Sequence, residues 1–225
     1  MNYFAHGRLY IASPYYLAGT AVPDWLNVVN RKVRARAKGA RLVVGHEDHQ
    51  IAEVASGILQ HHHDDDWFHR TDAFTELSWD FTVLIRDNLP VDDGLRPSFL
   101  GHIMVELLLD SVLMEDKPQL LDDYYQAVSQ IDGLVVQQAV NLIATKSTDQ
   151  LAYFIGRFKE VQFLKDYPDD EKLLHRLNQV MQRVKLPALP NSFTSLLPEM
   201  RTRVRTRQEE LLAHEGQSPE VEPAD

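Results

Sequence analysis

Residues 99–114 read FLGHIMVELLLDSVLM, and this stretch decides the fold class. Its apolar side chains recur at the three- and four-residue intervals of an α-helix. The same spacing continues through residues 120–131, 134–143, 151–163 and 173–184. Helix-entry and turn residues separate these segments, as at Pro168-Asp169-Asp170. The sequence therefore predicts an all-α fold, a bundle of helices joined by short loops.

Strand signals are scarce outside these segments. Leu42-Val43-Val44 could begin a strand, but one short run does not make a sheet. We expect one helical domain over residues 1–208. From Glu215 the chain reads EGQSPEVEPAD, which is acidic and almost without apolar residues. We therefore expect residues 209–225 to form an acidic, disordered tail.

Composition excludes several classes of protein. The chain has 225 residues, 23 Lys+Arg against 33 Asp+Glu, and no Cys. Without Cys there is no disulfide, no thiolate metal ligand and no cysteine nucleophile. A net charge of -10 argues against general nucleic-acid binding. No run approaches the roughly 18 apolar residues of a membrane span, and the opening lacks a secretion signal, so we expect a cytoplasmic protein.

Histidines and acids concentrate in GILQHHHDDDWFHRTDAF, residues 57–74. Because helical residues turn by about 100°, residues four apart lie on one face. One register aligns His61, Asp65 and His69. A competing register aligns His62 and Asp66 with either His69 or Arg70. Three adjacent His cannot all point inward, so at most two are ligands; His-x-x-x-Asp suits Zn, Mn or Fe.

A second row of ionisable residues lies in the helix predicted over residues 99–114. His102, Glu106 and Asp110 follow the same four-residue spacing among apolar residues. Buried charges are costly unless they are paired or bound to metal. The row is therefore either a set of metal ligands and their supporting residues, or simply the solvent face of the helix.

The remaining histidines and the basic residues add weaker candidates. His6 and Asp24 are further single candidates, whereas His46, His49, His175 and His214 have the character of ordinary surface residues. Basic residues gather at positions 31–41 and 201–207, and each run is either a solvated face or a local anion-binding surface. No Gly-x-Ser-x-Gly and no phosphate-binding glycine loop is present, so a serine nucleophile has no support.

Three parts of the chain together resemble the bacterial acyl carrier protein phosphodiesterases. The opening MNYFAH with Gly19 and Pro23-Asp24-Trp25 resembles the start of that family. The segment from Gly57 through His69 resembles its His- and Asp-rich helix. Residues 163–189, FLKDYPDDEKLLHRLNQVMQRVKLPAL, resemble its C-terminal part. The resemblance covers most of residues 1 to 190 and keeps the order of the parts.

That resemblance implies a fold and an activity. The family is all-helical and related to the HD-type metal phosphohydrolases. It hydrolyses the phosphodiester between 4'-phosphopantetheine and a serine of holo acyl carrier protein, with a divalent cation such as manganese. The ligand order is also similar to that of zinc-dependent phospholipase C and single-strand nucleases, and HIMVELLLD is closer to the phospholipase pattern. The matching positions here are His6, Asp24, His61, Asp65, His69, His102 and Glu106.

We therefore expect a metal-dependent phosphodiesterase that holds one to three Mn, Zn or Fe ions at those seven residues. Asp24, Asp65 and His69 are the expected catalytic residues among them. Arg34 and Arg36 are expected to bind phosphate. Four further residues are expected either to orient the ligands through hydrogen bonds or to replace them in the alternative helical register: His62, Asp66, Asp72 and Asp110. The alternatives are a phospholipase C-like or nucleotide phosphohydrolase, and a non-catalytic helical binding module.

Overall fold

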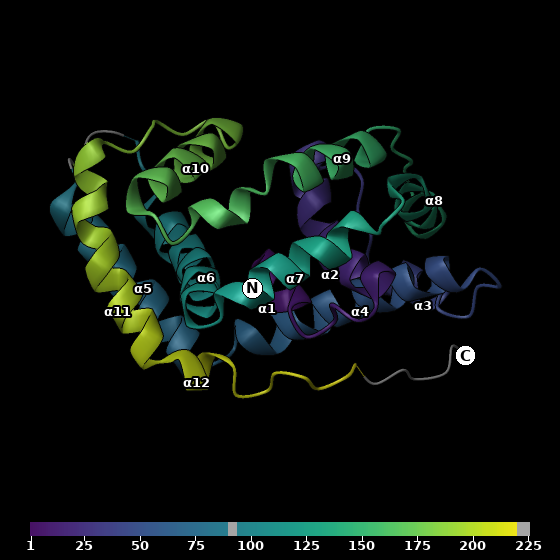
Figure 1. Cartoon of the computed structure of the whole chain (residues 1–225). Coiled ribbons are helices and arrows are strands. Elements are labelled where there is room, and N and C mark those ends of the chain that lie inside the picture. The colour runs from purple at the N-terminus through teal and green to yellow at the C-terminus, as the bar shows by residue number, and fades with distance from the viewer. Residues whose placement is uncertain (90–93, 220–225) are drawn as a thin grey trace. The chain divides into compact units, whose positions relative to one another are not determined.

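The chain folds into helices, as Figure 1 shows for the computed structural model. The structure describes residues 1–89 and 94–219. Within these residues the only regular elements are helices, and the all-α prediction is confirmed. The α-helices are α1 (Tyr3–Gly7), α2 (Pro14–Val29), α3 (Ala37–Arg41), α4 (His49–Phe68), α5 (Asp72–Asn88), α6 (Pro97–Asp116), α7 (Pro118–Ser129), α8 (Gly133–Ile143), α9 (Leu151–Val161), α10 (Asp170–Arg183), α11 (Leu197–Thr206) and α12 (Gln208–Leu211). Two 3-10 helices are η1 (Phe163–Asp166) and η2 (Asn191–Leu196).

These helices pack as two compact units. One, which we call the α6 unit, contains Met1 and residues 67–117 and 163–214. The other, the α2 unit, contains residues 2–66 and 118–162 and the segment that begins at Glu215. Each unit therefore combines segments that are far apart in the sequence.

Aromatic side chains form the core of the α2 unit. The rings of Trp25 and Phe158 lie 5.3 Å apart in an edge arrangement, and Tyr3 contacts the same Phe158 at 5.4 Å. Phe4 packs on Tyr124 at 5.7 Å. Because Phe4 and Trp25 are fully buried, they fix helices α1 and α2 against α7 and α9. Trp25 is thus a core residue with no face open to a ligand.

The α6 unit is built around α6, which packs against α5 and α11. Thr71 begins α5 by accepting a hydrogen bond from the backbone N–H of Phe74. By length and hydropathy, α6 would also suffice to cross a membrane, but 67% of its most apolar window is buried inside the protein, as in a core helix. The apolar residues of segment 99–114, which lies in α6, thus form core contacts.

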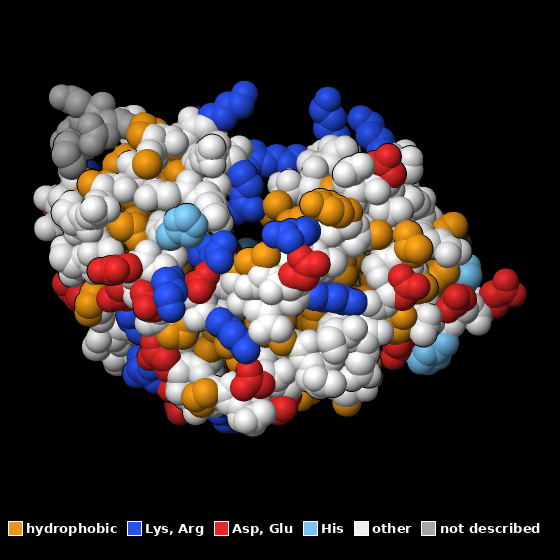
Figure 2. All heavy atoms as spheres, turned by 45° about the horizontal axis from the view of Figure 1, so that its top comes forward, with side chains coloured by type: hydrophobic (Ala, Val, Ile, Leu, Met, Phe, Trp, Pro, Cys, Tyr) orange, Lys and Arg blue, Asp and Glu red, His pale blue; other side chains and the backbone are white. Residues whose placement is uncertain are grey.

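The basic run at residues 201–207 is occupied by ion pairs within the α6 unit. Arg201 contacts Asp170 at 2.7 Å and Glu115 at 3.2 Å, and its guanidinium also donates to the hydroxyl of Ser111. Arg207 reaches Glu76 at 2.8 Å. Arg203 and Arg205 pair with Asp80, Glu199, Glu115 and Asp116. This run therefore joins helices, and Figure 2 shows basic and acidic side chains interspersed over the face that it draws.

Helix boundaries follow the sequence patterns closely from α6 to α10. Leu42 to Val44 form a turn after α3 rather than a strand. Within the expected tail, residues 209–211 belong to α12, and Glu215 forms an ion pair with Arg8. Residues 220–225 of that tail lie outside the described residues.

Candidate metal sites

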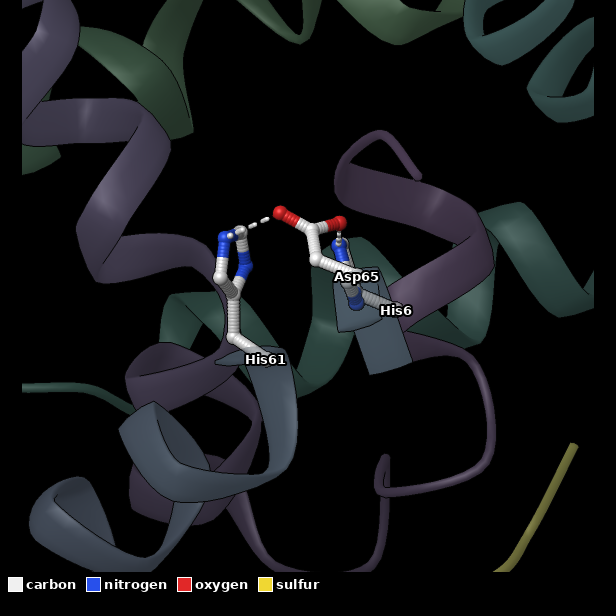
Figure 3. Close-up of side chains that lie close together, drawn as sticks. All are labelled: His6, His61 and Asp65. Atoms are coloured by element: carbon white, nitrogen blue, oxygen red, sulfur yellow. Dashed lines mark hydrogen bonds and ion pairs between the residues drawn. The ribbon is translucent and has the colours of Figure 1, made fainter. Parts of the chain in front are cut away.

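His6, His61 and Asp65 bring three possible metal ligands together within the α2 unit. Their ligand atoms all lie within 4.8 Å of one another. His6 comes from α1, whereas His61 and Asp65 lie one turn apart on α4. The Asp65 carboxylate stands between the two imidazoles, 3.2 Å from His6 Nε2 and 3.3 Å from His61 Nε2 (Figure 3). The two rings stack with their centroids 4.2 Å apart.

The other ring nitrogen of each histidine is held by an acceptor. His61 Nδ1 lies 2.7 Å from the backbone carbonyl of Thr20, so it must donate there. His6 Nδ1 lies 3.3 Å from the carboxylate of Asp64. Acceptors at Nδ1 orient an imidazole so that Nε2 faces the ligand position. Asp64 was not among the site residues predicted from the sequence, although its place between His63 and Asp65 was the available signal.

This triplet is strongly coupled electrostatically. Burial lowers the pKa of His6, but hydrogen bonds to Asp64 and Asp65 outweigh it and raise that pKa to about 9. Burial alone would raise the pKa of Asp65, whereas the charge of His61 and hydrogen bonds from His6 and His61 hold it well below its usual range. The carboxylates at this triplet therefore stabilise a positive charge there, which can be a proton or a metal cation.

A second triplet lies in the α6 unit. Oε1 of Glu106 is 2.9 Å from His69 Nε2 and 3.3 Å from His102 Nε2. Phe74 presents its ring to both imidazoles, at 4.7 Å from His69 and 4.9 Å from His102. The side chains are 31%, 48% and 20% exposed for His69, His102 and Glu106, so this site is open to solvent.

Two expected ligands take unexpected positions. Helix α4 ends at Phe68, so His69 does not continue the stripe of His61 and Asp65. Instead, His69 joins the second triplet. Asp24 is half-buried on α2 and belongs to neither triplet among the described residues. The seven-residue set is thus found as two groups of three and Asp24.

The expected supporting residues also differ in their surroundings. His62 donates from Nε2 to the carbonyl of Ala35 at 2.8 Å, whereas His61 is 3% exposed and joins the first triplet. Asp66 is exposed. Asp72 is exposed in the first turn of α5, and Asp110 is fully buried in α6. Because Asp64 contacts His6, it takes the orienting role that was expected of Asp72 or Asp110.

The basic residues at positions 31–41 have different partners from those at positions 201–207. Arg34 is exposed and donates to Asn27, and Arg36 is exposed at the start of α3. In the described part of the chain, no cation of residues 31–41 forms an ion pair with a carboxylate. Arg41 lines a pocket of about 560 Å³ together with His62, His63 and Asp66. One cation of this run thus lines a cavity together with side chains of α4.

Comparison of the chain with family models, with curated proteins and with solved structures found no match.

Proposed function

We propose that this chain is a metal-dependent phosphodiesterase that binds one divalent cation at His6, His61 and Asp65. The observation that carries the proposal is the orientation of the two imidazoles. Each Nδ1 has an acceptor, at Asp64 or at the Thr20 carbonyl, and each Nε2 faces Asp65. Two nitrogens and a carboxylate form a donor set that suits Zn, Mn or Fe.

A second cation is proposed at His69, His102 and Glu106. Each triplet supplies three protein ligands, which is typical of catalytic sites that keep a coordination position open. Asp65 is 32% exposed and His102 is 48% exposed, so neither triplet is sealed from solvent. A divalent cation supplies Lewis-acid chemistry, polarising phosphoryl oxygens and lowering the pKa of water.

The chain's own residues would bind and position the substrate. His62 and Asp66 each follow a member of the first triplet by one residue on α4, and both line the Arg41 pocket. A guanidinium pairs with phosphate oxygens through two parallel hydrogen bonds. We therefore propose that Arg41, with the expected Arg34 and Arg36 nearby in sequence, offsets the negative charge of the phosphodiester.

The 4'-phosphopantetheine ester of acyl carrier protein is the substrate that we propose within this class. Support for it comes from the sequence resemblance. A chain with a net charge of -10 would repel an acidic carrier protein at long range. The cations of residues 31–41, which form no ion pair with a carboxylate of the described residues, supply a local positive surface that offsets this repulsion.

Metal content and phosphodiesterase activity test the proposal together. Protein purified without added metal or a histidine tag should contain at least one divalent ion per chain. It should also hydrolyse bis-p-nitrophenyl phosphate with Mn or Zn. His61→Ala and Asp65→Ala should lose the activity and the ion of the first triplet, so that their metal content falls by one ion per chain. His49→Ala is the matched control, because His49 lies on the same helix with its side chain 85% exposed.

Protein without bound metal and without activity after Mn or Zn is added would refute the proposal. Metal content that stays undiminished in both His61→Ala and Asp65→Ala would refute this triplet as a site. Bound metal without turnover of any phosphodiester would instead favour a non-catalytic binding module.

A further inference from the structure

A chain of hydrogen bonds runs from the buried His6 to the C-terminal part of the α2 unit. Oδ2 of Asp64 faces His6 Nδ1 at 3.3 Å, and Oδ1 of the same carboxylate accepts from Gln60 Nε2 at 2.8 Å. Gln60 Nε2 also donates to the backbone carbonyl of Gln217 at 2.9 Å. His6, Gln60 and Asp64 are 1%, 1% and 5% exposed, so these three side chains are shielded from water, whereas the bond to the exposed Gln217 is part-buried.

The side-chain amide of Gln60 is fixed in one orientation. Its Oε1 accepts from the hydroxyl of Tyr16 at 3.0 Å, while both N–H groups have acceptors. Burial and the nearby Asp64 charge raise the pKa of Tyr16 to about 12, so this phenol keeps its proton and remains a donor. Turning the amide over would place its oxygen against a carboxylate and a carbonyl, at the cost of two hydrogen bonds.

Two features hold the segment Glu215–Gln217, which we call the C-terminal strap, against this network. Glu215 forms an ion pair with Arg8, whose side chain is 7% exposed and donates to the carbonyl of Ala5 in α1. Gly216 has a φ of 78°, a left-handed conformation that favours glycine. This turn brings the Glu215 side chain to Arg8 and the Gln217 carbonyl to Gln60.

We propose that Gln60 and the C-terminal strap are positioning elements for His6 and thereby set the cation affinity of the first triplet. The inference rests on the proposed function. Without the strap, one N–H of the buried Gln60 loses its acceptor, and the amide is no longer held in the orientation that supports Asp64. Asp64 in turn holds His6 Nδ1, so the direction of Nε2 loosens. Residues contributed from the end of the chain thus control a ligand in α1.

The test measures His6 and the metal separately. In metal-free protein, the ¹⁵N signals of the His6 ring should shift in Gln60→Leu, Gln60→Glu and Gly216→Ala. In the same variants, Zn²⁺ affinity measured by chelator competition should fall about tenfold, at the lower end of the range for outer-shell changes. Ser218→Ala is the matched control, because it lies one residue beyond the strap and should change neither quantity.

Unchanged His6 signals in Gln60→Leu and in Gly216→Ala would overturn the positioning role. Equal loss of Zn²⁺ affinity in Ser218→Ala would overturn it as well. If the wild-type chain bound no Zn²⁺, the proposed function would fail, whereas the His6 signals would still decide the inference. Gln60→Glu retains the size of the side chain and an acceptor for Tyr16, so it remains informative if Gln60→Leu does not fold.

Discussion

Asp64 determines how His6 presents its ring, and its removal should weaken metal binding. Asp64→Ala deletes the acceptor at His6 Nδ1 and leaves that N–H buried. Loss of such an outer-shell partner lowers metal affinity by about 10- to 100-fold. Competition with a chelator of known affinity measures the change. Asp66→Ala, at an exposed neighbour on α4, is the control, and equal weakening in both variants would contradict the assignment.

His6 should also make the stability of the metal-free protein depend on pH. Burial lowers its pKa, but bonds to Asp64 and Asp65 outweigh burial and raise it from 6.5 to about 9. The folded state therefore holds the proton more tightly, and this stabilisation is complete below pH 6.5 and lost as the pH rises through about 9. In the presence of a chelator, the urea midpoint should fall across that window. In His6→Gln this part of the slope should be absent; an identical slope would contradict the pKa.

At the scale of elements, the contact between α2 and α4 positions His61. A Cβ built on Gly57 would lie 2.0 Å from the carbonyl of Tyr16 and 2.8 Å from Cα of Gly19. Gly57→Ala must therefore push the helices apart and move the Thr20 carbonyl from His61. Such overpacking costs about 1–3 kcal/mol. We expect a lower free energy of unfolding, measured with urea, and weaker Zn²⁺ binding.

Gly156→Ala provides the matched comparison on α9. A Cβ there meets nothing within 4 Å, so the substitution should stabilise that helix by about 0.5–1 kcal/mol. Loss of stability in Gly156→Ala of the same size as in Gly57→Ala would mean that the α2–α4 contact has no special role.

Helices were easier to predict than the partners of their side chains. Periodic apolar residues located α6 to α10, because core packing requires that pattern. The same periodicity wrongly placed His69 on one helix with His61 and Asp65, since it does not reveal that α4 ends at Phe68. Two basic runs looked alike in sequence, yet among residues 1–89 and 94–219 only the second pairs with carboxylates. Its Arg207 and Glu76 are 131 positions apart. Such pairs depend on the tertiary fold, which local patterns do not encode.

For the whole molecule, metal removal should lower thermal stability. An ion that binds only the folded chain stabilises it by about 2.7 kcal/mol when its concentration is 100 times the Kd. We expect EDTA to lower the melting temperature in differential scanning calorimetry, and added Mn or Zn to restore it. His61→Ala should show a smaller response to EDTA, and a full response in that variant would place the stabilising ion elsewhere.

The segments of the two units alternate along the sequence, and this order limits how recombination can exchange the units. Any single break between residues 3 and 214 divides the α2 unit, because its segments lie on both sides of the α6 unit's segments. One recombination crossover therefore cannot exchange either unit whole between related genes. The two triplets span residues 6–65 and 69–106, so a single crossover between residues 65 and 69 would keep each triplet intact but would still divide the α2 unit.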